Sequence, residues 1–303
     1  MGILKNKVVI ITGGSGLLGS EFIKDIYEEG GIPINWDIDI SKPDENNIET
    51  DITSKNSVDK SLQEIIENFG EIHGLVNNAY PRTSDFGSEF EIMPIDSWKK
   101  NFDYQLTSHI YITKKIIEIM KIQKFGSIIN IGSIYGALGY KHSIYDGTLV
   151  NPSAAYSVIK GGIINFTRYL ASAYGAFGIR SNCVSPGGVF DKHERKFVEN
   201  YTSNTPLGRM ADPKDIASVP SLSSPIEYVI SLTFMPSSTH SGVGSMFIRV
   251  HFTFVPPQLT TAETYGIGPI WTMLKLVTSP SLGISTTRKS LSKQLAHAFR
   301  RSK

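Results

Sequence analysis

The chain of 303 residues has little of several features that mark particular classes of protein. It contains a single cysteine, Cys183, so it can form no internal disulfide, and no group of cysteines and histidines has zinc-site spacing. No uncharged apolar stretch reaches the length of about 18 residues that indicates a membrane span. The apolar run from Val8 to Thr12 is too short for the core of a signal peptide. We therefore expect a cytoplasmic protein with no metal site and no membrane partner.

The chain also has little net charge. It carries 30 Lys and Arg against 28 Asp and Glu, for +2, whereas proteins that cover nucleic acid usually have a large basic excess. We expect no nucleic-acid partner. The balance is uneven, however, because residues 221–303 hold eight bases and two acids, and residues 1–220 hold 22 bases and 26 acids. The two parts therefore have charges of +6 and −4 and differ in character.

Short apolar runs alternate with longer helical patterns through the first 190 residues. Fully apolar strands separated by amphipathic helices are typical of a parallel sheet covered on both faces, because parallel strands need crossover connections. The pattern predicts an α/β fold with a doubly wound, Rossmann-like parallel sheet. The predicted strands are Val8–Ile11, Ile32–Trp36, Gly74–Val76, Ser127–Ile131 and Arg180–Val184.

A glycine-rich turn follows the first predicted strand and leads into a helix. Glycines in such a turn let backbone N–H groups approach a diphosphate, and the helix N-terminus adds favourable partial charge. The turn is not a Walker loop, because Ser20 and Glu21 follow it. We predict that it binds the phosphates of a nucleotide through Gly13, Ser15, Gly16, Leu17, Leu18 and Gly19.

A carboxylate ends the second predicted strand. Asp37 lies 24 residues after Gly13, where a carboxylate accepts hydrogen bonds from ribose hydroxyls and repels a 2′-phosphate. This position favours NAD over NADP, although a solvated carboxylate at a strand end would look the same. Asp51 and Ile52 follow a third apolar-polar stretch, where we expect them to hold the adenine.

Three further motifs follow later strands in a fixed order. Asn77-Asn78-Ala79 follows one strand, Ser133 follows the next, and Tyr156 and Lys160 lie in a helix that Ser153 can cap. With the glycine turn, the segment Asn182–Gly188 and the segment Pro206–Met210, these motifs resemble the short-chain dehydrogenase/reductase family. The resemblance covers roughly residues 5–219. It implies that Asn78, Ala79, Pro186, Gly187 and Val189 also contact the cofactor.

The chemistry of Tyr156 and Lys160 agrees with the resemblance. They are four residues apart on a helix, so their side chains share a face. Lowering the tyrosine pKa from about 10 by roughly three units requires ~4 kcal/mol of phenolate stabilisation, which a nearby ammonium and a cationic nicotinamide can supply. The resemblance gives Lys160 the nicotinamide ribose and Ser133 the substrate oxygen. A second such pair, Tyr111 and Lys115, precedes Ser133 and is interpreted as structural.

Two features depart from the usual family pattern. Gln105 stands where the family usually has an asparagine that holds a proton-relay water, so the relay is either supported by a longer amide or missing. The spacing Thr-Gly-x-x-Gly-x-x-Gly is that of the extended branch, which includes nucleotide-sugar epimerases and dehydratases. The other motifs fit the shorter, single-domain dehydrogenases better, and we favour that interpretation.

An insertion suggests the class of substrate. The 22 residues between Ser133 and Tyr156 exceed the usual family spacing, and the extra segment, Gly139–Pro152, carries Tyr140, His142, Tyr145 and Asp146. It is expected to lie over the open end of the sheet, with Arg82 and Asp191–Arg195 bordering the same cleft. We predict a polar, anionic or sugar-like small-molecule substrate. The alternative is that these charges only solvate loops.

The sequence leaves three functions open. The first is an NAD-dependent oxidoreductase that acts on an alcohol or ketone. The others are a nucleotide-sugar epimerase or dehydratase with bound NAD, and a nucleotide-binding protein with weak or no catalysis.

The end of the chain does not follow the family. Pro220 would break the expected helix, and no Asp-Gly-Gly follows it. We predict a catalytic domain over residues 1–219 and an atypical basic segment over residues 220–303, interpreted as a divergent lid, a disordered tail or a shifted reading frame. A homo-oligomer stays open, because the missing elements often make subunit contacts.

Overall fold

A computed structural model describes residues 2–41, 43, 45–217, 232–234 and 248–250 of the protein, the last two segments by their backbone alone. These residues form one sheet with the order β3-β2-β1-β4-β5-β6-β7-β8, parallel throughout except for the antiparallel pair β7 and β8. The strands are β1 (Val8–Thr12), β2 (Ile32–Asp37), β3 (Asn47–Glu49), β4 (Gly74–Asn77), β5 (Gly126–Ile131), β6 (Ile179–Ser185), β7 (Leu232–Phe234) and β8 (Ile248–Val250). The predicted α/β fold is confirmed, and each predicted strand begins and ends within one residue of an observed one.

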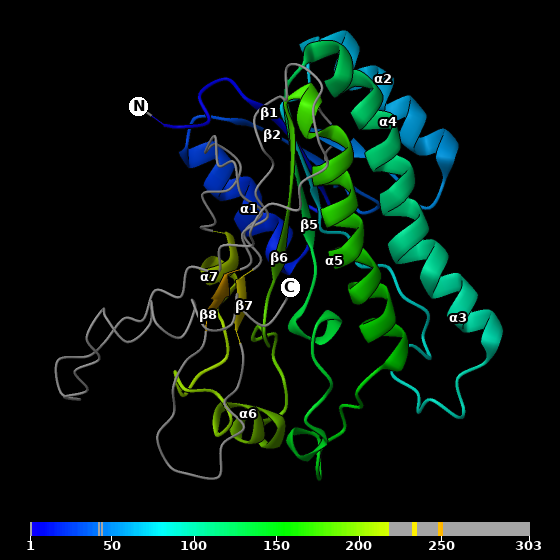
Figure 1. The fold of residues 1–303 in the computed structure, drawn as a ribbon, viewed down its shortest axis with the longest axis vertical. Coiled ribbons are helices and arrows are strands. Elements are labelled where there is room, and N and C mark those ends of the chain that lie inside the picture. Colours follow the sequence, from blue (N-terminus) through cyan, green and yellow to red (C-terminus); the bar gives the residue numbers. More distant parts are fainter. Residues whose placement is uncertain (1, 42, 44, 218–231, 235–247, 251–303) are drawn as a thin grey trace, which may run out of the picture. The chain divides into compact units, whose positions relative to one another are not determined.

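Helices connect the parallel strands and cover both faces of the sheet (Figure 1). The α-helices are α1 (Leu17–Glu28), α2 (Lys55–Phe69), α3 (Ile95–Phe102), α4 (Ser108–Gln123), α5 (Ala154–Tyr174), α6 (Arg195–Thr202) and α7 (Pro213–Ala217). A π-helical turn, η1 (Asp103–Thr107), joins α3 to α4. Short 3₁₀ turns are η2 (Ile134–Gly136), η3 (His142–Ile144) and η4 (Gly175–Phe177).

The alternation of side chains along β1 divides the core into two layers. Val8 and Ile10 pack with apolar residues of α2, α4 and α5, whereas Val9 and Ile11 pack with those of α1 and α7. Figure 1 shows α4 and α5 on one side of the sheet and α1 on the other. Since successive strand residues point to opposite faces, a strand covered on both sides must be apolar throughout, as β1 is.

The carboxyl ends of the parallel strands meet at one edge of the sheet. Thr12 and Asp37 end β1 and β2, Asn77 and Ile131 end β4 and β5, and Ser185 ends β6. The loops that follow these strands therefore begin next to one another, although some of them are more than 100 residues apart in the sequence. This edge is where ligands bind in open α/β sheets.

Two short strands extend the sheet beyond the predicted catalytic domain. β7 pairs with β6 through Val184 and Leu232, and β8 pairs with β7. Neither strand is among those predicted from the sequence. The rest of the predicted atypical segment, to which the three interpretations refer, lies outside the described residues.

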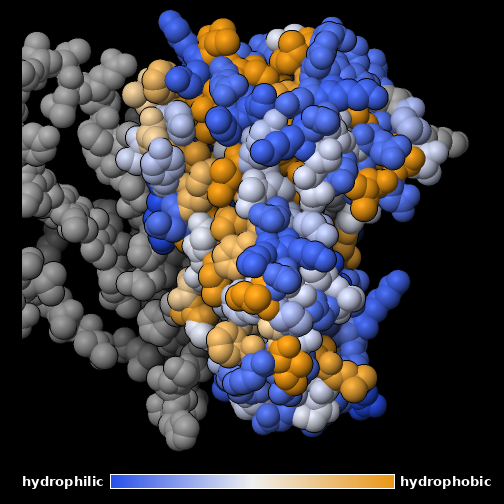
Figure 2. Space-filling model, turned by 90° about the vertical axis from the view of Figure 1, so that its right-hand side faces the viewer, coloured by the Kyte–Doolittle hydropathy of each residue, from blue (hydrophilic) through white to orange (hydrophobic). Residues whose placement is uncertain are grey.

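The helix surfaces turned away from the sheet are only partly polar. Figure 2 shows hydrophobic residues lying among hydrophilic ones on the side that faces the right of Figure 1. Exposed apolar side chains on the helices include Ile110 and Ile122 of α4 and Val158 and Tyr169 of α5. Among the described helices, none has the length and apolar character needed to cross a membrane.

Candidate active site

The glycine turn after β1 has the backbone geometry that its sequence predicts. Gly13 has a φ of +66°, and a Cβ atom there would lie 2.9 Å from Ala79 Cα. At Gly19, a Cβ atom would lie 2.1 Å from the Gly13 carbonyl oxygen. Gly13 therefore permits the turn to approach the end of β4, and Gly19 permits α1 to pack on the turn.

Thr12 ties this turn to the end of β4. Its Oγ1 accepts hydrogen bonds from the backbone N–H groups of Asn78 and Ala79, each at 3.0 Å. In return, Asn78 Nδ2 donates to the carbonyl oxygens of Thr12 and Gly13, each at 3.1 Å. The side chain of Asn78 thus fixes the glycine turn to the end of β4.

The carboxylate of Asp37 is held beside the turn. The Ser15 N–H donates to Asp37 Oδ2 at 3.0 Å, and the Asp39 N–H donates to Oδ1 at 3.3 Å. Asp51 is fixed in a similar way, because its Oδ1 accepts from the backbone N–H and the hydroxyl of Thr53. Both predicted acids therefore stand at the open edge of the sheet in defined orientations.

A cavity of about 860 Å³ runs along this edge. Every predicted site residue lines it except Ser15, Gly19 and Gln105. The Ser15 hydroxyl donates instead to the Asp39 carbonyl oxygen. Gly19 is buried where α1 packs on the glycine turn, and Gln105 is buried in η1. The predicted residues that the cavity does bring together are Gly13, Gly16, Leu17, Leu18, Asp37, Asp51, Ile52, Asn78, Ala79, Ser133, Tyr156, Lys160, Pro186, Gly187 and Val189.

Ser133, Tyr156 and Lys160 meet in the middle of the cavity wall. Ser153 caps α5, as predicted, since its hydroxyl accepts from the Tyr156 N–H at 3.4 Å. Lys160 Nζ donates to the Ile131 carbonyl oxygen at 2.7 Å and lies 5.6 Å from the centre of the Tyr156 ring. Ser133 lies two residues after the end of β5, and its hydroxyl forms a hydrogen bond with that of Tyr156. The three predicted catalytic groups are therefore in mutual reach.

Burial changes the acidity of this group. It lowers the pKa of Lys160 to about 8, and it raises the pKa of Tyr156 above its ordinary value of 10, with the bond to Ser133 acting in the opposite direction. The predicted lowering of the tyrosine pKa depended on a bound cationic nicotinamide as well as on Lys160, and it stays a prediction. In the chain alone, desolvation of the phenolate outweighs the partners that the chain itself provides.

The second Tyr-x-x-x-Lys pair lies elsewhere. The Tyr111 hydroxyl donates to Asp59 Oδ2 at 2.8 Å, and Lys115 forms an ion pair with Asp59 Oδ1 at 3.3 Å. These residues join α4 to α2 at the surface, and the ring of Tyr111 packs against the core. The interpretation of this pair as structural agrees with its position.

Aromatic side chains enclose the end of the cavity beyond Tyr156. One group surrounds the catalytic tyrosine, because the rings of Tyr80 and Phe86 meet the Tyr156 ring edge to face at centroid distances of 5.7 and 6.3 Å. A second group comes from three separate segments, and we call it the aromatic wall: Tyr135, Tyr140, Tyr145, Phe197 and Tyr201. The sequence analysis singled out only Tyr140 and Tyr145 of the wall.

The insertion supplies part of this wall. Tyr140, Tyr145, Val150 and Asn151 line the cavity, whereas His142 and Asp146 do not. The insertion is fixed to α6 because Asn200 Nδ2 donates to the carbonyl oxygens of Ile144 and Asp146, each at 3.0 Å. Of the other predicted border residues, Arg82, Asp191 and His193 line the cavity.

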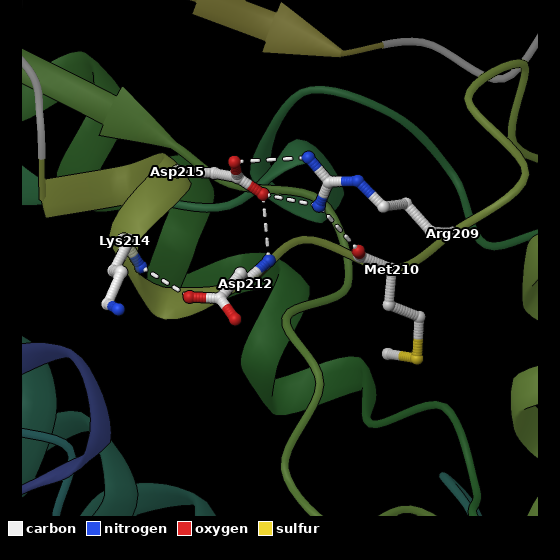
Figure 3. A network of polar contacts seen from close by, with 5 residues as sticks. All are labelled: Arg209, Met210, Asp212, Lys214 and Asp215. Atoms are coloured by element: carbon white, nitrogen blue, oxygen red, sulfur yellow. Dashed lines mark hydrogen bonds and ion pairs between the residues drawn. The ribbon is translucent and has the colours of Figure 1, made fainter.

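A polar network fixes the segment that closes this end (Figure 3). The guanidinium of Arg209 donates to both carboxylate oxygens of Asp215 and to the Met210 carbonyl oxygen, and Asp215 also accepts from the Asp212 N–H. Bonding to Arg209 holds the pKa of Asp215 below its usual range. The network thereby holds Met210 against the cavity, where its side chain joins the cluster of Phe197 and Tyr201.

Two polar residues, Gln105 in η1 and His109 in the first turn of α4, are buried. Both amide atoms of Gln105 lack a hydrogen-bond partner among the described residues, whereas His109 bonds the Ala79 backbone. Gln105 was expected from the family order, but His109 was not. Its polar character within an apolar helix pattern was the available sequence signal.

The residues around the turn fit a dinucleotide. Asp37 and Asp51 line the same cavity as the glycine turn and Tyr156, so one extended ligand can contact all of them. Across the part of the chain that the structure describes, no three His, Cys, Asp or Glu side chains gather as a metal site would require.

Comparisons with known proteins agree with this geometry. Residues 39–222 match a family model described as enoyl-(acyl carrier protein) reductase, which ends close to the predicted limit at 219. The chain is 30% identical over 228 residues to post-translational flagellin modification protein A of Campylobacter coli, covering 71% of this chain and 89% of that protein. It is 28% identical to 7alpha-hydroxysteroid dehydrogenase of Bacteroides fragilis, covering 72% and 86%.

A solved structure has a similar fold. The short-chain dehydrogenase of Leptospira borgpetersenii with bound NAD+ superposes with a TM-score of 0.64 at 30% identity, over 71% of this chain and 84% of that one. Its ligand supports a nicotinamide cofactor for the cavity described above. The chain belongs to the short-chain dehydrogenase/reductase family and is an oxidoreductase of that general type.

Proposed function

We propose that the protein is an NAD-dependent oxidoreductase that interconverts an alcohol and a ketone on a polar, sugar-like substrate. The observation that carries the proposal is one cavity with Asp37 at one end and Ser133, Tyr156 and Lys160 in the middle. Both the cofactor and the substrate would then be in contact with the catalytic group.

Asp37 supports the preference for NAD. Its carboxylate is fixed by two backbone N–H groups and lines the cavity beside the glycine turn. A fixed negative charge accepts hydrogen bonds from two ribose hydroxyls and repels a 2′-phosphate. No Lys or Arg is present between Thr12 and Glu21 to attract that phosphate.

The chain's own residues provide the proton chemistry of the reaction. A nicotinamide, when bound, accepts or gives the hydride and brings a positive charge in its oxidised form. Ser133 donates a hydrogen bond to the substrate oxygen and orients it towards Tyr156. Tyr156 removes the hydroxyl proton of an alcohol, or returns it to a ketone, while the Lys160 ammonium favours the phenolate.

The lining of the substrate end supports a polar ring as the substrate. Aromatic faces pack against the C–H faces of a ring, and the Tyr140 hydroxyl, which donates to the Ser153 carbonyl oxygen, keeps lone pairs that can accept a hydrogen bond. The exposed guanidinium of Arg82 stacks 5.3 Å from the centre of the Tyr80 ring and can meet an anionic group.

The proposal is tested by the reduction of NAD+ with a panel of alcohols. Sugars, sugar phosphates and nucleotide sugars form one arm, and apolar alcohols and hydroxysteroids form the other. We expect NADH to form with members of the first arm. Activity confined to the apolar arm would contradict the substrate class, and conversion of a nucleotide sugar without net NADH would indicate an epimerase or dehydratase instead.

A further inference from the structure

The inference concerns Arg82, and it rests on the proposed function because it names the class of substrate that the same cavity would take. Arg82 lies on the loop after β4, is exposed, and lines the cavity. Arg195 and Arg209 each pair with an acid, whereas Arg82 forms no ion pair within the part of the chain that the structure describes. A guanidinium that lines a ligand cavity without an acidic partner can bind an anionic group of the ligand.

Tyr80 holds this guanidinium in place. The guanidinium carbon of Arg82 lies 5.3 Å from the centre of the Tyr80 ring, and the guanidinium also bonds the Tyr80 hydroxyl. The buried ring of Phe86 packs edge to face with the Tyr80 ring at a centroid distance of 5.8 Å. An arginine stacked on an aromatic ring still has N–H groups at the edge of its plane, so the stack presents a planar donor group in a fixed orientation.

The loop itself is anchored by a buried amide. Asn101 of α3 is fully buried, and its Oδ1 accepts from the Thr83 N–H at 3.1 Å while its Nδ2 donates to Thr83 Oγ1 at 2.7 Å. The Ser97 hydroxyl donates to Asp85 Oδ2 at 2.6 Å, which ties the loop to α3 a second time. These bonds fix the chain directly after Arg82, so its position beside the cavity is set by the fold.

The guanidinium lies one aromatic ring away from the catalytic tyrosine. The centre of the Tyr80 ring is 5.3 Å from the guanidinium carbon of Arg82 and 5.7 Å from the centre of the Tyr156 ring. All three residues line the same cavity. A substrate whose hydroxyl or ketone meets Tyr156 can therefore place another substituent beside Arg82.

Arg82 is the cation that remains for such a substituent. Lys160 Nζ lies 5.5 Å from the centre of the same Tyr80 ring, but Lys160 is buried and donates to a backbone carbonyl oxygen. The acids that line the cavity are Asp37, Asp51 and Asp191, and none of them pairs with Arg82. Because two cations beside one ring attract an anion and repel a further cation, this end of the cavity favours an anionic substituent.

We propose that Arg82, oriented by Tyr80, binds an oxyanion of the substrate, either a carboxylate or a phosphate, while Tyr156 acts on a hydroxyl or ketone of the same molecule. A planar guanidinium binds both oxyanions through two parallel N–H···O bonds, which a neutral hydroxyl cannot match. The substrate class is therefore a sugar acid or a sugar phosphate. Tyr80 is a positioning residue in this arrangement, since it acts through Arg82.

Turnover of matched substrates tests the proposal. Sugar acids, sugar phosphates and their neutral parent sugars are compared in the reduction of NAD+, so that the two acidic sets show which oxyanion is preferred. We expect Arg82→Met to raise KM for the acidic substrate by roughly 10- to 100-fold, with kcat and the turnover of the neutral parent unchanged. Arg82→Lys keeps the charge and loses the planar fork, so its KM should lie between those of the wild type and Arg82→Met. Arg168→Met is the matched control, since Arg168 of α5 is exposed and does not line the cavity.

Two replacements of Tyr80 separate its positioning role from a structural one. Tyr80→Phe keeps the ring beside the guanidinium and removes the hydroxyl that bonds it, whereas Tyr80→Leu removes both. We expect KM for the acidic substrate to rise in the order wild type, Tyr80→Phe, Tyr80→Leu, with KM for the neutral parent unchanged. Adding Tyr80→Leu to Arg82→Met should raise KM no further, because both changes remove the same contact.

Chemical labelling gives a readout that does not depend on turnover. Phenylglyoxal modifies accessible guanidinium groups, and mass spectrometry of peptides from the full chain measures the labelling of each arginine. With NADH bound, D-glucuronate or inorganic phosphate should slow the labelling of Arg82 and leave that of Arg168 unchanged.

Three results would overturn the inference. They are a wild type that prefers the neutral parent sugar, an Arg82 whose labelling neither oxyanion slows, and an Arg82 that NADH alone protects, which would assign the guanidinium to the cofactor. The proposed function fails separately, because wild-type turnover of Tyr156→Phe would contradict it and leave the labelling of Arg82 as expected.

Discussion

The replacement of Asp37 by asparagine tests the choice of cofactor. In the structure, the carboxylate accepts from the Ser15 N–H at 3.0 Å and lines the cavity in a partly exposed position. Asparagine keeps an oxygen for that N–H and removes the negative charge. The variant therefore changes the electrostatics of the ribose site with little change to the turn.

The expected magnitude follows from the charges. A 2′-phosphate carries a charge of about −1.5 to −2, and each pair of unit charges about 4 Å apart costs ~1 kcal/mol in water and ~4 kcal/mol near a protein surface. Because Asp37 is partly exposed, we take the lower part of this range, about 2–3 kcal/mol. That corresponds to roughly 30- to 140-fold weaker binding of NADPH than of NADH by the wild type.

Fluorescence titration with NADH and NADPH measures both affinities. We expect Asp37→Asn to bind NADPH more tightly by most of that factor and NADH less tightly, because the amide accepts only one strong hydrogen bond. Asp39→Asn is the control, since Asp39 is two residues away and does not line the cavity. A wild type that binds NADPH as tightly as NADH, or an Asp37→Asn variant with an unchanged ratio, would refute the assignment.

Three other substitutions follow from the geometry. Gly19→Ala places a Cβ atom 2.1 Å from the Gly13 carbonyl oxygen, so we expect the free energy of unfolding to fall by about 1–3 kcal/mol, with a lower melting temperature. Gly139→Ala is the control, because its Cβ atom enters open space and should leave the melting temperature unchanged. Burial lowers the pKa of Lys160 from 10.5 to about 8, so the unfolded state binds more protons between these values. The wild type should therefore gain stability relative to Lys160→Met as the pH rises across that window, and urea titrations of the two proteins at the same pH values measure this difference. Tyr111→Phe removes the surface bond to Asp59 and should leave turnover unchanged, and a loss of turnover would reopen the interpretation of that pair.

Much of the fold was predictable because its signals are local. β1 is apolar at every position, as a strand covered on both faces must be, and the turn after it contains the glycines that its positive φ and close approaches require. The order of Ser133, Tyr156 and Lys160 along the chain placed them at one edge of a parallel sheet. That placement follows from the order of the strands alone, because parallel strands end at the same edge of a sheet.

Other features depend on contacts between distant segments. The aromatic wall joins Tyr135, the insertion and α6, and no local pattern indicates that Tyr201 faces Tyr145. Strands β7 and β8 are three residues each, too short to give an alternating pattern. The sequence places Lys160 one helical turn from Tyr156 but does not give the burial of the phenol, which is the larger influence on the pKa of Tyr156 in the chain alone.

The central claim is that Tyr156 moves the proton of the reaction while the rest of the chain binds the cofactor. It is tested most directly by Tyr156→Phe, which removes one oxygen from the cavity wall and leaves the ring contacts with Tyr80 and Phe86. With a substrate from the polar arm, we expect NADH formation to fall by at least about 100-fold while NADH binding stays at the wild-type level. Turnover of Tyr156→Phe at the wild-type rate would contradict the account.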